Sequence, residues 1–257
     1  MEKSNRTVKR ALDILELLRN EDRPLTCKEI AQLLDVPLTS AFDITRTLLQ
    51  EDYLEYAAPT SKAYVLGVKC FEIGMGYMKR LNVVQIAEPY AERLMKISNS
   101  TCFVAGIYKH QIIYLSKIEA PTSVHTSAVL GARRYMYSTG LGKAILACYP
   151  NEKVAEIFGK SEIKPFTEYT IVSLDKLYED LEQTHKRGFS IDDREGNTDV
   201  YCVAAPIRDH TDQPVAAISV AMLYSMRTDA LVASISKEIC EAALAISRKM
   251  GYTGSLY

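Results

Sequence analysis

The 257-residue sequence has no tryptophan, and its six cysteines are scattered without any pair in C-x-x-C spacing. Paired cysteines at that spacing are typical of zinc sites and redox motifs, whereas scattered cysteines fit reduced thiols in a cytoplasm. The sequence also lacks an apolar run long enough to cross a membrane, and its N-terminus lacks the pattern of a signal peptide. We therefore expect a soluble cytoplasmic protein with no metal site and no membrane partner.

The sequence also has no strong net charge. It has 31 Lys and Arg and 32 Asp and Glu, which gives a formal net charge of −1. Residues 1–80 carry twelve basic and twelve acidic side chains, so the N-terminal part is equally neutral. Proteins that bind nucleic acid neutralise phosphates with basic side chains, so the bulk charge argues against that partner. The exception is a basic cluster in the first ten residues, formed by Lys3, Arg6, Lys9 and Arg10.

Residues 25–55, LTCKEIAQLLDVPLTSAFDITRTLLQEDYLE, have the pattern of two short helices joined by a tight turn and followed by a strand. Thr26 followed by Glu29 has the spacing of a capping box, which starts the first of these helices. The DVP triplet breaks that helix, and Thr39 or Ser40 is expected to start the next one.

A helix precedes this stretch and a hairpin follows it. The helical period of VKRALDILELL places Val8, Leu12, Leu15 and Leu18 on one face, with Ala11 and Ile14 beside it. Residues 53–56 and 63–66 have the pattern of two short strands around a turn. Three helices followed by a hairpin predict a winged helix-turn-helix, with the helix-turn-helix itself at about residues 26–46.

In a helix-turn-helix, the second helix is buried on one side and inserts its other side into the major groove of DNA. Hydroxyl groups suit phosphates or base edges, arginine suits guanine, and an aspartate can accept from a cytosine amino group. The candidate DNA contacts are Thr39, Ser40, Phe42, Asp43, Arg46 and Thr47 on this helix, Arg6 in a basic N-terminal arm, and Lys62 at the tip of the hairpin. A three-helix bundle that does not bind DNA has the same helical pattern and stays open as the alternative.

The pattern changes in the second part of the chain. The β-rich runs TCFVAGIY, QIIYLSKI, FSIDD, VYCVAAPIRD and VAAISVAML alternate with helical segments, which predicts an antiparallel sheet flanked by helices. We expect an α+β chain with a winged helix-turn-helix domain over residues 4–67, a linker helix over residues 68–82 and a second domain over residues 83–253.

Several motifs, in order over nearly the whole chain, resemble the IclR-type family of bacterial transcription regulators. They are RALDILELL, PLTCKEIAQLLDVPLTSAFDITRTLLQEDYLE, YVLGVKCFEIG, LMKISNSTCFVAGIYKHQIIYLSKIEA, STGLGKAILA, KRGFSIDDREGNTDVYCVAAPIRD and VAAISVAML. The resemblance implies a GAF-like second domain that binds a small-molecule effector and thereby changes binding to double-stranded operator DNA. It also implies a homodimer or a dimer of dimers, and from it we expect a repressor without a cofactor.

The sequence departs from the family pattern at positions that affect specificity. Asp35 stands where the family usually has glycine in the turn, and aspartate tolerates a left-handed conformation better than most residues. Asp43 stands where many members carry arginine on the recognition helix. Gly196, Asp199 and Tyr201 replace a common histidine, glycine and arginine. The operator sequence and the effector therefore do not transfer from relatives.

The segment STGLGKAIL places two glycines at a helix start, where backbone N–H groups can hold an anion. The resemblance implies that this segment lines the effector pocket and that Asp192 and Cys202 contact the effector. Gly140 and Leu141 are then expected to donate to a ligand carboxylate or carbonyl, with Val200 as an apolar neighbour. From the helix-start donors we expect an organic or sugar acid. Asp192 and Cys202 lie ten residues apart on two strands that could be neighbours. The alternative interpretation is a surface aspartate and an inert buried cysteine.

Two other classes of function stay open. Cys202 as a nucleophile would need a general base, and nothing in the sequence pairs it with one of the four histidines. The HExxH, phosphate-loop and nucleophile-elbow patterns are also absent, so we expect no enzyme. A ligand-sensing oligomer without specific DNA binding is the other class, and the neutral N-terminal region favours it.

Overall fold

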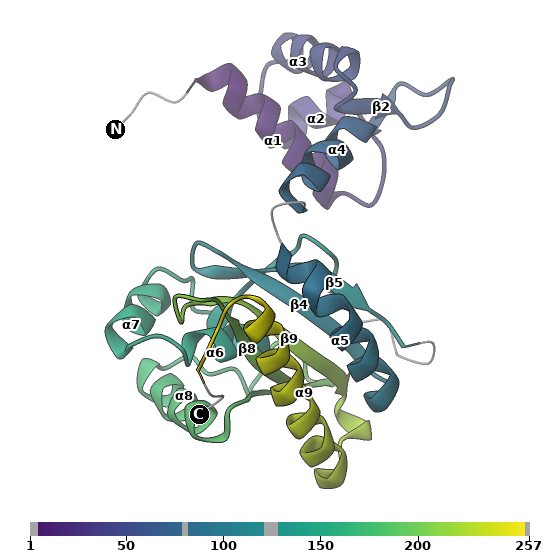
Figure 1. The fold of residues 1–257 in the computed structure, drawn as a ribbon. Helices are drawn as coiled ribbons and strands as arrows, with labels where there is room; N and C mark the ends of the chain where they lie inside the picture. Colours follow the sequence, from purple (N-terminus) through teal and green to yellow (C-terminus); the bar gives the residue numbers. More distant parts are fainter. Residues whose placement is uncertain (1–4, 79–81, 121–127, 255–257) are drawn as a thin grey trace. The chain divides into compact units, whose positions relative to one another are not determined.

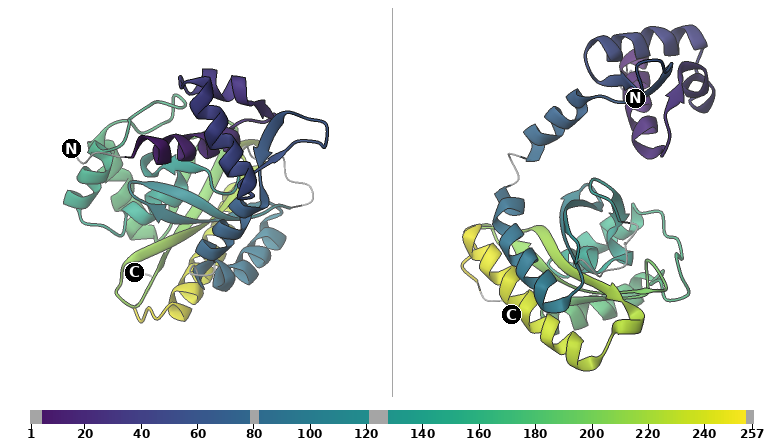
Figure 2. Two further views of the ribbon diagram at one scale, coloured as in Figure 1. Left: turned by 90° about the horizontal axis from the view of Figure 1, so that it is seen from above. Right: turned by 90° about the vertical axis from the view of Figure 1, so that its right-hand side faces the viewer.

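The computed structural model describes residues 5–78, 82–120 and 128–254. Contacts within the chain divide it into two units, residues 1–81 and 82–257, which Figures 1 and 2 show from three sides. Both units combine helices with antiparallel strands, which confirms the α+β class. Across the described residues, no helix has both the length and the apolar character that a membrane span requires.

The N-terminal unit is a winged helix-turn-helix, as the sequence predicts. Its elements are α1 (Arg6–Asn20), β1 (Leu25–Thr26), α2 (Cys27–Leu33), α3 (Leu38–Gln50), β2 (Leu54–Tyr56), β3 (Ala63–Leu66) and α4 (Val68–Met78). The hairpin strands β2 and β3 pair as expected, whereas β1 is an addition that the sequence did not predict. It completes a small sheet in the order β1-β3-β2.

Local interactions explain where the two helices of the motif begin and end. The Thr26 hydroxyl accepts from the Glu29 N–H, and the Glu29 carboxylate accepts from the Thr26 N–H, so the predicted capping box is present. Asp35 has a φ of 50°, which confirms a left-handed turn residue. The predicted start of α3 at Thr39 or Ser40 is wrong, because the helix begins at Leu38, directly after Pro37. Proline has a φ near the helical value, so the chain enters the helix without a side-chain cap.

The core of this unit includes only part of the face of α1 that its sequence predicts, since Leu18 is buried and Leu15 packs against the core from a half-buried position. Ile14 and Leu18 are buried, whereas Val8 and Leu12 are 55% and 57% exposed. The buried side chains that pack together are Ile14, Leu18, Leu25, Ile30, Ile44, Leu48, Leu54 and Tyr64. Because α1 has apolar residues on two adjacent stripes, its period alone does not decide which stripe faces the core.

The C-terminal unit contains a six-stranded antiparallel sheet in the order β6-β5-β4-β9-β8-β7. Its strands are β4 (Thr101–Tyr108), β5 (Gln111–Ile118), β6 (Arg133–Tyr135), β7 (Ser190–Asp193), β8 (Val200–Arg208) and β9 (Pro214–Leu223). Its helices are α5 (Asn82–Ser98), α6 (Gly140–Leu146), α7 (Asn151–Gly159), α8 (Leu174–Arg187) and α9 (Asp229–Lys249), with short 3-10 turns at Met136–Ser138 and Tyr224–Met226. This is the antiparallel sheet with flanking helices that the sequence predicts.

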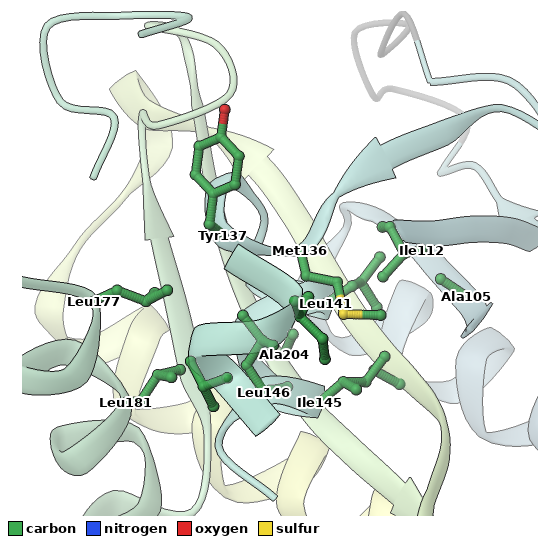
Figure 3. Packing of buried hydrophobic residues seen from close by; sticks show 14 of the residues in the cluster. Ala105, Ile112, Met136, Tyr137, Leu141, Ile145, Leu146, Leu177, Leu181 and Ala204 are labelled. Atoms are coloured by element: carbon green, nitrogen blue, oxygen red, sulfur yellow. The ribbon is translucent and has the colours of Figure 1, made fainter. Parts of the chain in front are cut away.

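Helices cover both faces of this sheet. The long helices α5 and α9 lie side by side, as Figures 1 and 2 show, and pack on β4, β8 and β9. Helix α6 packs on the other face, where its side chains lie between the sheet and α8 (Figure 3). Leu141 and Ile145 from α6 share this cluster with Ala105, Leu177 and Ala204. The N-terminal end of α6 is thereby fixed against β7 and β8.

Candidate functional site

The exposed surface of α3 carries most of the predicted DNA contacts. Its buried side chains are Ala41, Ile44, Thr45 and Leu48, which lock the helix onto its unit. The outward side chains are Thr39, Phe42, Asp43, Arg46 and Thr47, all of which are exposed. The geometry of a recognition helix is therefore present.

Ser40 differs from the other predicted contacts, because it is half-buried and already engaged. Its hydroxyl accepts a hydrogen bond from the Arg10 guanidinium at 3.0 Å, which brings α1 to the start of α3. The sequence gives no signal of this contact, since thirty residues separate Arg10 from Ser40. Arg10 is an additional cation beside the recognition helix.

The basic residues Arg6, Lys9 and Arg10 lie in the first turns of α1, so this part of the predicted basic arm is helical. The Asn5 side chain caps this helix by accepting from the N–H groups of Thr7 and Val8, and such a cap is a strong helix start. Arg6 is exposed at the first helical position, and Lys3 lies outside the described residues.

The hairpin turn places Lys62 on the surface of the wing. The turn is closed by a hydrogen bond from the Ser61 N–H to the Ala58 carbonyl at 2.9 Å. Lys62 follows directly and is exposed, one residue before β3. Lys62 therefore presents its side chain to solvent at the tip of the wing.

The C-terminal unit has a cavity of about 360 Å³ beside the start of α6. The residues that line it are Phe103, Tyr114, Ala128, Arg134, Ser138, Thr139, Gly140, Leu141, Phe166, Asp192, Gly196, Asn197, Asp199, Val200, Cys202, Ser219, Ala221 and Leu223. The structure thus brings together all five predicted effector residues, which are Gly140, Leu141, Asp192, Val200 and Cys202. Sequence reasoning missed Phe103, Tyr114, Arg134 and Phe166, because their distance along the chain gives no signal of this proximity.

Asp192 and Cys202 are direct cross-strand neighbours on β7 and β8, which confirms that their strands pair. Gly140 approaches both closely. A Cβ atom at Gly140 would lie 3.5 Å from the Cβ of Cys202 and 3.6 Å from the Cβ of Asp192. One wall of the cavity is therefore built where a helix start, a carboxylate and a thiol meet.

The first N–H groups of α6 face this wall. Thr139 caps the helix, since its hydroxyl accepts from the Gly142 N–H at 3.1 Å. Within the described residues, no cap or turn hydrogen bond uses the N–H groups of Gly140 or Leu141. These two groups are available as donors to a bound molecule, as the sequence analysis expects.

A buried charge cluster lies behind the same wall. Lys143 on α6 is only 1% exposed and is ion-paired with Glu195 and, at 3.0 Å, with Asp180 of α8. Burial alone would lower the pKa of Lys143, but the two carboxylates raise it above its usual value. Burial raises the pKa of Glu195 to about 7, and Lys143 only partly opposes this change. The cluster holds α6, α8 and the β7–β8 loop together.

Asp192 joins the cavity to this cluster. Its Oδ1 atom accepts from the Glu195 N–H at 2.8 Å, so the carboxyl group fixes the start of the β7–β8 loop. Burial raises the pKa of Asp192 to about 6, with Lys143 opposing the change. The group is therefore largely ionised at neutral pH and can accept a hydrogen bond from a ligand.

Cys202 lacks the electrostatics of a nucleophile. Burial and the neighbouring Asp192 carboxylate raise the pKa of its thiol well above the usual value, which keeps it neutral. Reactive cysteines instead have a lowered pKa and a neighbouring cation or base. The described part of the chain also holds no group of three or more His, Cys, Asp or Glu side chains placed to bind a metal.

Comparison with protein families agrees with this architecture in both units. The model described as IclR helix-turn-helix domain matches residues 7–58, and the model described as Bacterial transcriptional regulator IclR C-terminal matches residues 75–248. The C-terminal match alone covers more than half of the chain.

Individual relatives match nearly from end to end. The HTH-type transcriptional repressor AllR of Escherichia coli K12 is 28% identical over 250 residues, which are 97% of this chain and 92% of that protein. The crystal structure of IclR from Thermotoga maritima is 30% identical, has a TM-score of 0.82, and covers 96% of this chain and 99% of its own.

A third relative shares the fold at lower identity. It is an IclR homologue from Microbacterium hydrocarbonoxydans, solved in complex with 4-hydroxybenzoate. It is 19% identical with a TM-score of 0.83, covering 95% of this chain and 98% of its own. AllR is a transcriptional repressor rather than an enzyme, and the matched family models cover both units. The chain belongs to the IclR family of bacterial transcriptional regulators, with a helix-turn-helix DNA-binding domain and a C-terminal effector-binding domain.

Proposed function

We propose that this regulator is a repressor whose operator binding is controlled by an organic acid in the 360 Å³ cavity. The observation that carries the proposal is the convergence of Gly140, Asp192 and Cys202 on that cavity from three separate elements. Curated relatives such as AllR are repressors, which supports the sign of regulation.

The chemistry of the lining supports an acid that also carries a hydroxyl group. The free N–H groups of Gly140 and Leu141 and the Arg134 guanidinium suit a carboxylate. Asp192 suits a donor such as a hydroxyl, because its ionised form only accepts hydrogen bonds. A hydroxylated organic acid or a sugar acid meets both requirements, and 4-hydroxybenzoate in the Microbacterium protein has this combination of groups.

Aromatic side chains add an apolar surface to the cavity. The rings of Phe103 and Tyr114 lie 5.0 Å apart between centroids, at an interplanar angle of 51°. Phe166 lines the same space from the segment before α8. A planar or ring-shaped body would pack on these side chains, while a two-carbon acid would leave most of the cavity to water.

We also propose that the protein acts as a homodimer or a dimer of dimers. The DNA-binding unit exposes large apolar side chains on α1, namely Val8 and Leu12, and on α4, namely Phe71 and Ile73. Large apolar side chains grouped on a helix can form a contiguous exposed patch, and such patches mark protein–protein contacts. Two copies would present two α3 helices to a palindromic operator. Because its proposed target is chromosomal DNA, we place the protein in the bacterial cytoplasm.

The direct test is footprinting of the full-length protein on the DNA upstream of its own gene. We expect a protected, near-palindromic site in dilute buffer, and its release when a screened organic acid is added. Acids would be screened by thermal shift, starting with 4-hydroxybenzoate and sugar acids. Protection that no acid in the screen weakens would contradict the effector proposal, and protection strengthened by an acid would contradict repression by release.

A ligand-sensing oligomer without specific DNA binding is the alternative function. It is favoured by the balanced charge of the DNA-binding unit and by Asp43 on the outward face of α3, where it repels phosphates. No protected bases at low salt, with and without acids, would support this alternative.

A further inference from the structure

The recognition helix exposes two large apolar side chains beside its polar ones. Leu38 is 53% exposed and Phe42 is 51% exposed, although the rest of the apolar side of α3 is buried. The two residues lie four positions apart, so their side chains are neighbours one helical turn from each other. They form an apolar strip in the first half of α3, which we call the Leu38–Phe42 strip.

The position of this strip along the helix matters for its role. In helix-turn-helix proteins, the N-terminal half of the recognition helix contacts base edges in the major groove. The only large apolar feature of a base edge in that groove is the C5-methyl group of thymine. An apolar side chain there discriminates thymine from cytosine by contact with this methyl group.

The neighbouring polar residues fix the direction in which the strip faces. Asp43 and Arg46 are exposed on the adjoining part of α3, and around the helix Arg46 lies between the strip and Thr39. Arg46 lies one turn beyond Phe42, so a guanine contact by Arg46 places Phe42 at a nearby base pair. The Thr47 hydroxyl is less available, since it donates to the Asp43 carbonyl at 3.0 Å.

We infer that the Leu38–Phe42 strip reads thymine methyl groups, so that each operator half-site has thymine next to the guanine contacted by Arg46. This inference rests on the proposed binding of operator DNA and adds a specificity determinant to it. Because the N-terminal unit is nearly neutral, it makes few contacts to phosphates. Contacts between the strip and thymine methyl groups add binding free energy to these few contacts. Phe42, with the larger side chain, makes the main contact, and Leu38 extends it by one base pair.

The test uses DNA in which the methyl group alone is removed. The full-length protein first selects sites from a pool of random-sequence duplexes, and the best duplex is then synthesised with deoxyuridine in place of single thymines. Loss of one contacted methyl group should weaken binding about fourfold, as for one buried methyl-sized group. At the thymine whose replacement weakens wild-type binding most, Phe42→Ala should bind the thymine and uracil duplexes equally, and Phe42→Leu should keep part of the difference.

Leu33→Ala is the matched control. Leu33 is an equally exposed leucine, but it lies at the end of α2 rather than on α3. This variant should keep the full difference between thymine and uracil duplexes. Thermal melting of all three variants would confirm that they stay folded.

The possible failures are distinguishable. If a specific site is selected but uracil at each thymine in turn has no effect, or Phe42→Ala keeps the wild-type difference, the inference is overturned and operator binding stands. Selection of a half-site that contains no thymine would also overturn the inference and leave operator binding standing. If no sequence is enriched from the pool, both the inference and the proposed operator binding fail.

Discussion

The ammonium group of Lys143 is ion-paired with the Glu195 carboxylate, although 52 residues separate them. The pair joins the helix that forms one wall of the cavity to the loop that contributes Gly196 and Asn197 to its lining. A second carboxylate, from Asp180, connects the same ammonium to α8. The geometry of the cavity therefore depends on a buried cluster that does not itself line it.

Replacing Lys143 with methionine should destabilise the C-terminal unit by about 3 kcal/mol, because it leaves the buried Glu195 carboxylate without its cation, whereas the partly exposed Asp180 keeps Arg187 at 3.8 Å. Urea denaturation at pH 8 measures this change. Lys153→Met is the control, since Lys153 pairs with Glu156 on the surface. An exposed pair contributes less than about 1 kcal/mol. Equal losses in the two variants would show that burial of the Lys143 cluster has no energetic effect.

The stability of the protein should fall as pH rises from about 5 to about 8. Glu195 has a pKa of about 7 in the folded protein, raised by burial from 4.5. A raised pKa means that the folded state holds the proton more tightly, so the contribution is complete below pH 4.5 and is lost as pH rises through 7. The free energy of unfolding, measured by urea denaturation at several pH values in this range, should fall less steeply with pH for Glu195→Gln than for the wild type. Parallel curves would contradict the raised pKa.

Substitution of Gly142 by alanine should destabilise the protein by about 1–3 kcal/mol, because the added Cβ would overlap the backbone of Met136. Gly159 at the end of α7 is the matched control, since a Cβ there meets nothing within 4 Å. Gly159→Ala should be neutral or stabilise by up to about 1 kcal/mol, through its helix propensity. Thermal unfolding of both variants gives the comparison. A neutral Gly142→Ala would show that α6 can shift away from Met136.

Asp192→Asn should weaken binding of the acid found by thermal shift by about ten- to a hundredfold, the usual value of a hydrogen bond to a charged group. Operator affinity without the acid should stay at the wild-type level. Asp193→Asn is the control, because successive strand residues point to opposite faces and Asp193 pairs with Arg194 instead. Calorimetric titration measures the affinity of both variants for the acid. Equal affinities of Asp192→Asn and Asp193→Asn would show that Asp192 does not contact the acid.

Local sequence signals predict much of the N-terminal unit. Thr26 and Glu29 predict the start of α2, and Asp35 predicts its left-handed turn, because caps and turns depend on neighbouring residues. The buried face of α1 was predicted wrongly at Val8 and Leu12, since that choice depends on elements far along the chain. The two-residue strand β1 is too short to have a period.

The candidate effector site is also predicted only in part, because some of its contacts are local and others join distant elements. The pairing of Asp192 with Cys202 follows from two strands joined by a short loop. The ion pairs of Lys143 join three elements, and no spacing in the sequence predicts such a meeting. Likewise, Arg134 and Tyr114 reach the cavity only because β5 and β6 pair at the edge of the sheet.

The close approach of Gly140 to β7 and β8 has a practical consequence. An alanine there would meet Ala204, Cys202 and Asp192 at ordinary contact distances of 3.5 to 3.6 Å, so its methyl group fits without displacing the strands. Gly140 lines the cavity, so that single carbon would add bulk at the cavity wall beside β7 and β8. Gly140→Ala is thus a conservative first substitution for changing which molecules the proposed effector site accepts, while the residues of α3 stay untouched.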